Sequence, residues 1–257
     1  MASLRTLRDG GDAEFLLRAL GLAEPGLDLL QWIEGNTELI KSERHSRVGL
    51  VATADGLCHC KLYLSKSPLQ RMLFRLGIAR GLRSFDMSLK LRAAGIEVPR
   101  PLACYAAPGS LLLLTEGIAD ALDLKSLWLQ DPAPEVFSAL LETAARSLAR
   151  MHGAGFSHGD CKWSNFICVA GKIYFVDLEN VAHCAPGRGA QLRDLARFTL
   201  NAEDMGAPAQ SYHGFLEVYA EAMGISAKEL PARFLPQLEA LRARHLKSYG
   251  ARGHRLI

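Results

Sequence analysis

A polar loop and the short hairpin after it hold the residues of this chain that could most readily do chemistry. The loop reads His158-Gly-Asp-Cys-Lys-Trp-Ser-Asn165, and the hairpin-like segment that follows ends on a second aspartate, Asp177. Carboxylate and amide oxygens are hard ligands of the kind that suit magnesium. Each of these residues alone would be an ordinary polar group of a surface loop. Together, in this order and directly after a helix, they indicate a site.

The order of these parts resembles the kinase superfamily. HGDCKWSN is similar to its H-x-D-x-x-x-x-N catalytic loop, and Asp177 falls where the aspartate of its D-F-G motif falls. The resemblance implies ATP and Mg2+ as cofactors, with Asp160 orienting the acceptor hydroxyl and receiving its proton. It also implies that Asn165 and Asp177 hold magnesium, and that Lys162 adds positive charge close to the transferred phosphoryl group.

The same resemblance assigns residues outside the loop. Lys61 is similar to the strand lysine that pairs with the α- and β-phosphates of ATP. Its family partner is a helix glutamate, for which Asp86, with a shorter reach, is the candidate here. Glu116, at the expected lobe boundary, is grouped with them as nucleotide-binding. His158 and Asp194 are expected to support the catalytic loop, Asp194 as a helix aspartate that braces its backbone.

Departures from the protein-kinase pattern narrow the family. The G-x-G-x-x-G loop is missing; only Gly49 lies near its place, so other backbone amides, or Arg44 and Arg47, would have to cover the phosphates. Asp177-Leu-Glu replaces D-F-G, and no long activation segment follows it. With A-G-I-E-V-P-R-P at 94–101 and R-D-L-A-R at 193–197, the chain resembles the lipopolysaccharide core kinases of Gram-negative bacteria over about residues 45–205. That group phosphorylates heptose or 3-deoxy-octulosonate (Kdo) sugars of the inner core.

These residues need a scaffold of strands followed by helices, and the hydrophobic pattern predicts one. Two strand-like runs, at 47–53 and 57–64, are joined by an Asp-Gly turn and place Lys61 on the second strand. Further strands are expected at 102–107 and 111–115. An amphipathic helix begins after Asp131-Pro132.

The expected fold is therefore α+β and two-lobed, of the protein-kinase type. Residues 46–117 form a small β-rich N-lobe that binds nucleotide, and residues 118–257 form a mainly helical C-lobe with the catalytic loop and the metal site. Residues 1–45 are expected to be an N-terminal extension without an assigned role, apart from a helix at 13–20.

Composition and cysteine usage exclude several other classes. The chain has 257 residues, of which 49% are hydrophobic and 22% charged, as in a globular protein. No apolar run approaches the ~20 residues of a membrane span, and the first residues lack the apolar core of a secretory signal, so we expect a cytoplasmic location. The six cysteines form no C-x-x-C pair and read as buried thiols, and His152, His158 and Cys161 match no common zinc pattern.

Positive charge is concentrated in one part of the chain, although the net charge is only +3. Residues 61–92 hold eight Lys or Arg against one acid, which suits an anionic surface or a phosphate-bearing substrate. Within this segment Leu69, Met72, Leu73 and Leu76 share one helical face. That stripe predicts either an interfacial helix or a helix packed into the core with its arginines outward.

The partners expected are a lipopolysaccharide core oligosaccharide as acceptor and a peripheral contact with the inner face of the inner membrane. No nucleic acid is expected, because the basic tail around Tyr249 belongs to no recognised module. The oligomeric state is left open.

Two other functions remain open from the sequence. A small-molecule phosphotransferase of the aminoglycoside or choline kinase type shares H-G-D-x-x-x-x-N, but such enzymes usually line the acceptor pocket with acids, and the segments after Asp177 are mixed to basic. A pseudokinase or assembly factor would explain the absent glycine loop. The main hypothesis is an ATP- and magnesium-dependent kinase that phosphorylates a heptose or Kdo hydroxyl.

Overall fold

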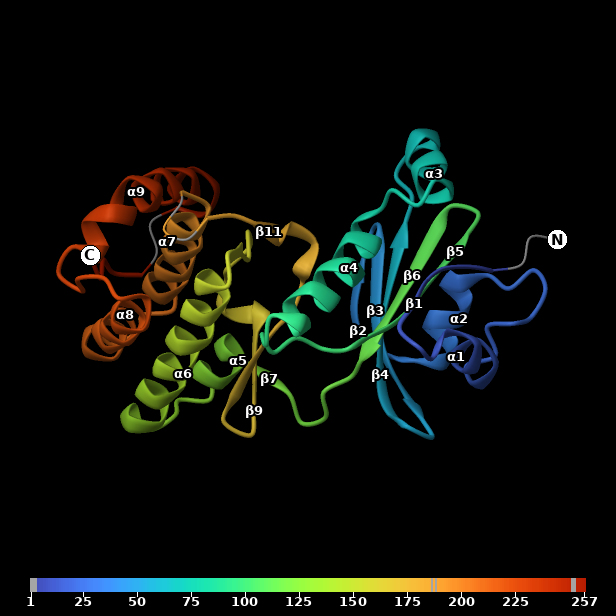
Figure 1. Ribbon diagram of the computed structural model, residues 1–257, viewed down its shortest axis with the longest axis horizontal. Coiled ribbons are helices and arrows are strands. Elements are labelled where there is room, and N and C mark those ends of the chain that lie inside the picture. The colour runs from blue at the N-terminus through green and yellow to red at the C-terminus, as the bar shows by residue number, and fades with distance from the viewer. Residues whose placement is uncertain (1–3, 186, 188, 251–252) are drawn as a thin grey trace. The chain divides into compact units, whose positions relative to one another are not determined.

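The computed structural model describes residues 4–185, 187, 189–250 and 253–257, and the chain divides into two compact units (Figure 1). The first is built from the chain up to Arg92 together with Pro99–Ala119, and the second from Ala93–Val98 and Asp120–Ile257. The first unit is rich in strands and the second in helices. The predicted α+β class is therefore confirmed.

A six-stranded antiparallel sheet forms the centre of the first unit. Its strand order is β1-β5-β6-β4-β3-β2. The strands are β1 (Arg5–Asp9), β2 (Glu38–Glu43), β3 (Ser46–Thr53), β4 (Gly56–Leu64), β5 (Pro101–Ala107) and β6 (Ser110–Glu116). The predicted hairpin is β3–β4, and Lys61 lies on β4 opposite Val48 and Leu113.

Helices cover both faces of this sheet, because its central strands bury side chains on both sides. The helices are α1 (Ala13–Ala19), α2 (Leu29–Asn36), α3 (Pro68–Arg75) and α4 (Arg80–Ala93). On β4, Cys58, Cys60 and Leu62 pack in one cluster with α1 and α2. On the opposite face, Leu111 and Leu113 of β6 pack with residues of α3 and α4. Lys61 alternates with the cysteines and so lies on the α4 side.

Residues 5–43, predicted as an extension, take part in the sheet and its core. β1 and β2 form its two edges, and Trp32 and Ile33 of α2 are buried. The Trp32 indole Nε1 donates to the Leu20 backbone oxygen at 2.8 Å. These elements are short, and every residue of β2 is exposed, so their sequences carry little of the alternation from which a strand is predicted.

Helices dominate the second unit. They are α5 (Leu124–Trp128), α6 (Pro134–Gly153), α7 (Gly189–Asp204), α8 (Ala209–Met223) and α9 (Leu230–Tyr249). One small sheet has the order β10-β9-β7 and another pairs β11 with β8. Their strands are β7 (Leu122–Asp123), β8 (Phe156–Ser157), β9 (Phe166–Val169), β10 (Lys172–Phe175) and β11 (Ala182–His183), and two short 3-10 turns are η1 (Trp163–Asn165) and η2 (Leu178–Asn180). The apolar stripe predicted for α6 is buried, as Phe137, Leu141 and Leu148 show.

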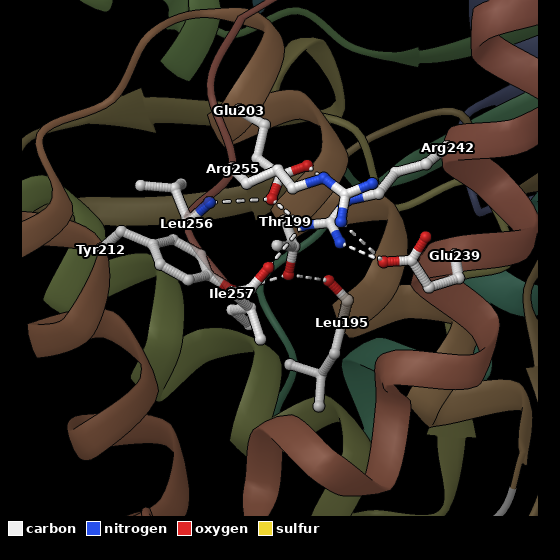
Figure 2. Close-up of polar contacts among 9 residues, drawn as sticks. All are labelled: Leu195, Thr199, Glu203, Tyr212, Glu239, Arg242, Arg255, Leu256 and Ile257. Carbon is white, nitrogen blue, oxygen red and sulfur yellow. Dashed lines mark hydrogen bonds and ion pairs between the residues drawn. The ribbon is translucent and has the colours of Figure 1, made fainter.

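A buried ion pair fastens α9 and residues 255–257 to α7 (Figure 2). Arg242 donates to both carboxylate oxygens of Glu203, through Nε at 3.0 Å and through the second terminal nitrogen, and also to the Ile257 backbone oxygen at 3.0 Å. Glu203 accepts as well from the backbone N–H of Leu256 at 3.0 Å. The side chains of the pair are only 10% and 5% exposed. Because both charges are paired and hydrogen-bonded, α7 has a fixed place beside α9.

No helix in the described part of the chain combines the length and apolarity that crossing a membrane requires.

Candidate active site

A buried carboxylate of α7 holds the polar loop that follows β8. Asp194 is 1% exposed and accepts from the backbone N–H groups of His158, at 2.6 Å, and Gly159, at 2.8 Å. The His152 Nε2 lies 3.3 Å from the same carboxylate. Since both oxygens bind loop groups, α7 determines how the chain enters the loop. This is the geometry that a bracing role for Asp194 requires.

Glycine is required at the second position of this loop. Gly159 has φ +79°, a left-handed conformation that L side chains rarely adopt. An added Cβ would also lie 2.5 Å from the Asn180 backbone oxygen. The loop therefore packs directly against the segment that follows Asp177.

The imidazole of His158 joins the loop to the end of β10. Its Nε2 is 3.0 Å from the Val176 oxygen, and its Nδ1 is 3.3 Å from the Asp160 backbone N–H. One nitrogen must donate and the other accept, which the neutral ring with a proton on Nε2 does. Burial lowers the pKa of His158, against the charges of Asp194, Asp160 and Asp177, which act to raise it. His158 is thus a neutral structural link.

The carboxylate of Asp160 lies between two cations. Lys162 Nζ is 2.9 Å from Oδ2, and a terminal nitrogen of Arg197 is 3.2 Å from Oδ1. The Asn165 side-chain amide donates to the Asp160 backbone oxygen at 2.8 Å and to its Oδ2 at 3.3 Å. The carboxylate itself is 15% exposed, whereas Lys162 and Arg197 are 40% and 42% exposed. Asp160 is therefore fixed in orientation while one part of it stays open to a small reactant.

Asp177 is brought to the same loop by the residue before it. The Val176 N–H donates to the Asn165 backbone oxygen at 3.1 Å, and the Val176 oxygen is the partner of His158. Asp177 then adopts φ 60° and ψ 53°, the left-handed region that aspartate and asparagine tolerate better than most residues. The hairpin end and the loop are thus joined at two points within one unit.

Asn165 and Asp177 offer a donor set that fits magnesium. Because the Asn165 nitrogen is directed to Asp160, its amide oxygen lies at the other end of the group, and Asp177 adds a carboxylate. Magnesium usually takes one or two such protein ligands and completes its shell with phosphate oxygens and water. In the described residues no group of three or more His, Cys, Asp or Glu could hold a metal ion.

One face of α7 supports the loop and the segment that leads into it, and most of that face is missing from the sequence prediction. Gln191 donates to the backbone oxygens of His152 and Phe156, and Asn201 accepts from the Trp163 backbone N–H at 2.9 Å. With Asp194 and Arg197 these residues recur at steps of three or four, which places them along one side of a helix. Arg197 is the addition that matters most for chemistry. The R-D-L-A-R spacing that marks Asp194 could have identified it.

The three residues predicted to bind nucleotide lie in the first unit. Lys61 Nζ lies 5.2 Å from the centre of the Tyr63 ring. Asp86 accepts from Arg8 of β1, from Nε at 2.7 Å and from a terminal nitrogen at 3.0 Å. Glu116 accepts from the Arg100 backbone N–H at 3.1 Å. Asp86 thus has an arginine partner that the sequence prediction does not include, and its pairing with Lys61 stays a prediction.

The turn between β2 and β3 has no glycine and consists of Arg44 and His45. Arg47, predicted as a cover for phosphates, donates from Nε to Glu34 at 2.8 Å. Gly49 lies within β3, where an added Cβ would overlap the Thr37 side chain. Its small size is therefore explained by packing.

Comparisons with known proteins agree with this geometry. Residues 42–219 match the model of the lipopolysaccharide kinase (Kdo/WaaP) family. The chain is 32% identical, over 38% of its length and 42% of the relative's, to the 3-deoxy-D-manno-octulosonic acid kinase of Vibrio parahaemolyticus serotype O3:K6. It is 29% identical, over 51% and 55%, to the lipopolysaccharide core heptose(I) kinase WaaP of Pseudomonas aeruginosa. The match to the Vibrio enzyme spans less than half of that relative's length.

A solved structure of WaaP in complex with acyl carrier protein has a similar fold. The TM-score is 0.59 at 20% identity, and the match covers 95% of this chain and 99% of that one. The predicted two-lobed, protein-kinase-like fold and the family resemblance are confirmed. The acyl carrier protein is a partner of that protein, of a kind that the sequence analysis does not predict.

Proposed function

We propose, because this chain belongs to the lipopolysaccharide kinase (Kdo/WaaP) family, that it transfers the terminal phosphoryl group of ATP to a sugar hydroxyl, of heptose or Kdo, in the lipopolysaccharide inner core. The observation that carries the proposal is the environment of Asp160. Its carboxylate is partly open, is oriented by Asn165, and has the ammonium of Lys162 at 2.9 Å and the guanidinium of Arg197 at 3.2 Å.

In the proposed reaction Asp160 accepts a hydrogen bond from the acceptor hydroxyl and orients its oxygen. The hydroxyl oxygen forms a bond to the terminal phosphorus as the bond from phosphorus to ADP breaks, and the hydroxyl proton passes to a carboxylate oxygen of Asp160. Lys162 and Arg197 stabilise the negative charge that accumulates on the phosphoryl oxygens. Positioned charges of this kind supply most of the barrier reduction in phosphoryl transfer.

Asn165 and Asp177 would hold magnesium, which when bound neutralises charge on the phosphates. His158 and Asp194 keep the loop in place but do not touch the reactants. In the first unit, Lys61 is proposed to bind the α- and β-phosphates, with Glu116 at the nucleotide and Asp86 as the acid near the lysine. Arg8 holds the Asp86 carboxylate, so a substitution of Arg8 would release that carboxylate.

The charges around Asp160 favour an anionic acceptor over a cationic one. Lys162 and Arg197 are about two-fifths exposed, so both present positive charge at the carboxylate. An aminoglycoside or choline would bring further positive charge beside these two cations, whereas Kdo carries a carboxylate and core sugars carry phosphates. We therefore propose a core oligosaccharide acceptor, met at the inner face of the inner membrane by a cytoplasmic protein.

The test is phosphoryl transfer by the purified full chain, from radiolabelled ATP with Mg2+, to dephosphorylated core oligosaccharide. Asp160→Asn and Asp177→Asn should each lower turnover by about two orders of magnitude or more, because each removes a charge at the reacting groups. Asp55→Asn removes an equal charge from the exposed turn between β3 and β4 and should leave turnover unchanged. Asparagine also tolerates the left-handed conformation at position 177, so folding should persist.

Three outcomes would contradict the proposal. Full turnover by Asp160→Asn would exclude the assigned role of this carboxylate. Transfer to an aminoglycoside or choline, but not to core sugars, would favour the small-molecule alternative. Calorimetry that shows no magnesium-dependent nucleotide binding would favour a pseudokinase.

A further inference from the structure

Helix α3 and the turn after it present large apolar side chains to solvent. Leu69, Met72, Leu76 and Ile78 are 62%, 50%, 63% and 59% exposed. We call these four residues the α3 apolar face. Single exposed apolar residues are common on protein surfaces, but four within ten residues form a patch.

This face is separate from the side of α3 that packs into the first unit. Phe74 is 4% exposed and belongs to the buried cluster with Leu82 and Phe85 of α4. At 3.6 residues per turn, Leu69, Met72 and Leu76 lie within about 60° of one another, and Phe74 lies at least about 140° away from them. The core of the first unit therefore accounts for Phe74 and leaves the α3 apolar face uncovered.

The surroundings of the face are strongly positive. From Leu57 to Phe85 the sequence has six Lys or Arg and no acid. Lys66, Arg71 and Arg80 are exposed near the apolar residues. Arg71 also reaches the turn between β5 and β6, which places α3 at one end of the sheet, as Figure 1 shows for the first unit.

We propose that the α3 apolar face binds an anionic lipid bilayer surface. An apolar stripe flanked by cations is the arrangement of a helix that lies at a membrane interface, with its apolar residues at the acyl boundary and its cations among the headgroups. A short, outward-facing helix offers little area to a folded protein, for which a standard interface buries about 800 Å² per partner. The choice of a membrane also rests on the proposed function, because the proposed acceptor is anchored in lipid.

The experiment is cosedimentation of the full chain with vesicles in the absence of ATP and acceptor. Vesicles of phosphatidylglycerol mixed with phosphatidylcholine should bind the protein at low salt. Binding should fall at least about tenfold with phosphatidylcholine alone, and also when the salt concentration is raised to several hundred millimolar. These dependences follow from the cations beside the face.

The matched variants distinguish binding by the α3 apolar face from nonspecific binding by other exposed apolar residues. Leu69→Gln/Met72→Gln/Leu76→Gln should weaken vesicle binding at least about tenfold, since glutamine keeps helix propensity and removes the apolar contact. The control triple, Leu129→Gln/Val136→Gln/Leu246→Gln, changes residues that are 67%, 55% and 57% exposed elsewhere and should bind as the wild type does. An unchanged urea midpoint for both variants shows that folding is intact.

Equal binding by the α3 triple and the wild type, or no wild-type binding to anionic vesicles, would overturn the proposal. A dimer that only the α3 triple abolishes, without vesicle binding, would overturn it too and assign the face to a second copy of the chain. Phosphoryl transfer to a delipidated acceptor is measured separately. A protein that binds vesicles but is inactive therefore refutes the proposed function and not this surface, and the reverse result refutes only this surface.

Discussion

Two glycines of the second unit have nearly the same backbone conformation but different surroundings. Gly159, in the loop from His158 to Asn165, has φ +79°, and Gly171, in the turn between β9 and β10, has φ +74°. An alanine Cβ at Gly171 meets nothing within 4 Å, whereas at Gly159 it would lie 2.5 Å from the Asn180 backbone oxygen and 2.9 Å from the Asn180 Cβ. Substituting each by alanine separates backbone strain from loop packing.

The two substitutions should differ in their cost to stability. A left-handed alanine costs about 1–2 kcal/mol, and this is all that Gly171→Ala adds. Gly159→Ala adds an overpacking cost of about 1–3 kcal/mol, because the closest contact is to backbone and cannot rotate away. We therefore expect the free energy of unfolding to fall by about 1–2 kcal/mol for Gly171→Ala and by about 2–5 kcal/mol for Gly159→Ala, measured by urea denaturation.

They should differ more in activity. To relieve the contact with Asn180, the loop must move by several tenths of an ångström, and it carries Asp160 directly after position 159. Misplacement by about 1 Å can cost about a hundredfold in rate, so we expect turnover to fall by about tenfold to a hundredfold in Gly159→Ala and by less than about twofold in Gly171→Ala. Equal losses of both stability and turnover in the two variants would refute the reasoning from loop packing.

Three further predictions follow from the second unit. Arg242→Ala leaves the buried Glu203 charge unpaired and should lower the free energy of unfolding by about 3–5 kcal/mol, whereas Arg146→Ala, which breaks an exposed pair on α6, should cost less than about 1 kcal/mol in the same urea assay. Arg197→Gln should lower turnover on core sugars by about tenfold or more while the urea midpoint stays within the range of surface substitutions, and an unchanged turnover would contradict its assignment. Burial depresses the pKa of His158 in the folded protein. The neutral ring therefore contributes fully to stability above the pKa of the unfolded chain, about 6.5. As the pH falls below that pKa, this contribution is lost by up to about 1.4 kcal/mol per pH unit, until the pKa of the folded state is reached. Between pH 7.5 and pH 5.5 the free energy of unfolding should therefore fall less in His158→Gln than in the wild type. An equal fall in both proteins would contradict a neutral His158 ring.

The parts of the site that the sequence predicts are those that lie close together along the chain. His158, Asp160, Lys162 and Asn165 fall within one loop, and the hairpin that ends at Asp177 follows at once, so their spacing alone indicates the motif. Their supports are distant in sequence. Gln191 and Asn201 lie on a helix whose register against the loop depends on tertiary packing, which a local pattern does not contain.

The N-terminal strands and α3 show two other limits. β1 and β2 are edge strands without a buried residue, so alternation is weak where pairing with a neighbour decides the structure. For α3 the apolar stripe is plain in the sequence, but periodicity does not distinguish a stripe that faces the core from one that faces solvent. The exposure of Leu69, Met72 and Leu76, with Phe74 buried on the other side of the helix, resolves that choice in favour of exposure.

Helix α7 connects the stability of the second unit to the geometry of the loop. Asp194 holds the loop backbone and Arg197 contacts Asp160, while Glu203, further along the same helix, is paired with Arg242 of α9. From Asp194 to Glu203 the helix rises by about 14 Å, so a change at Arg242 can reach the loop only by moving or loosening α7 as a whole. Arg242→Ala should therefore lose activity in proportion to its loss of folded protein, whereas Arg197→Gln should lose activity in protein that stays folded.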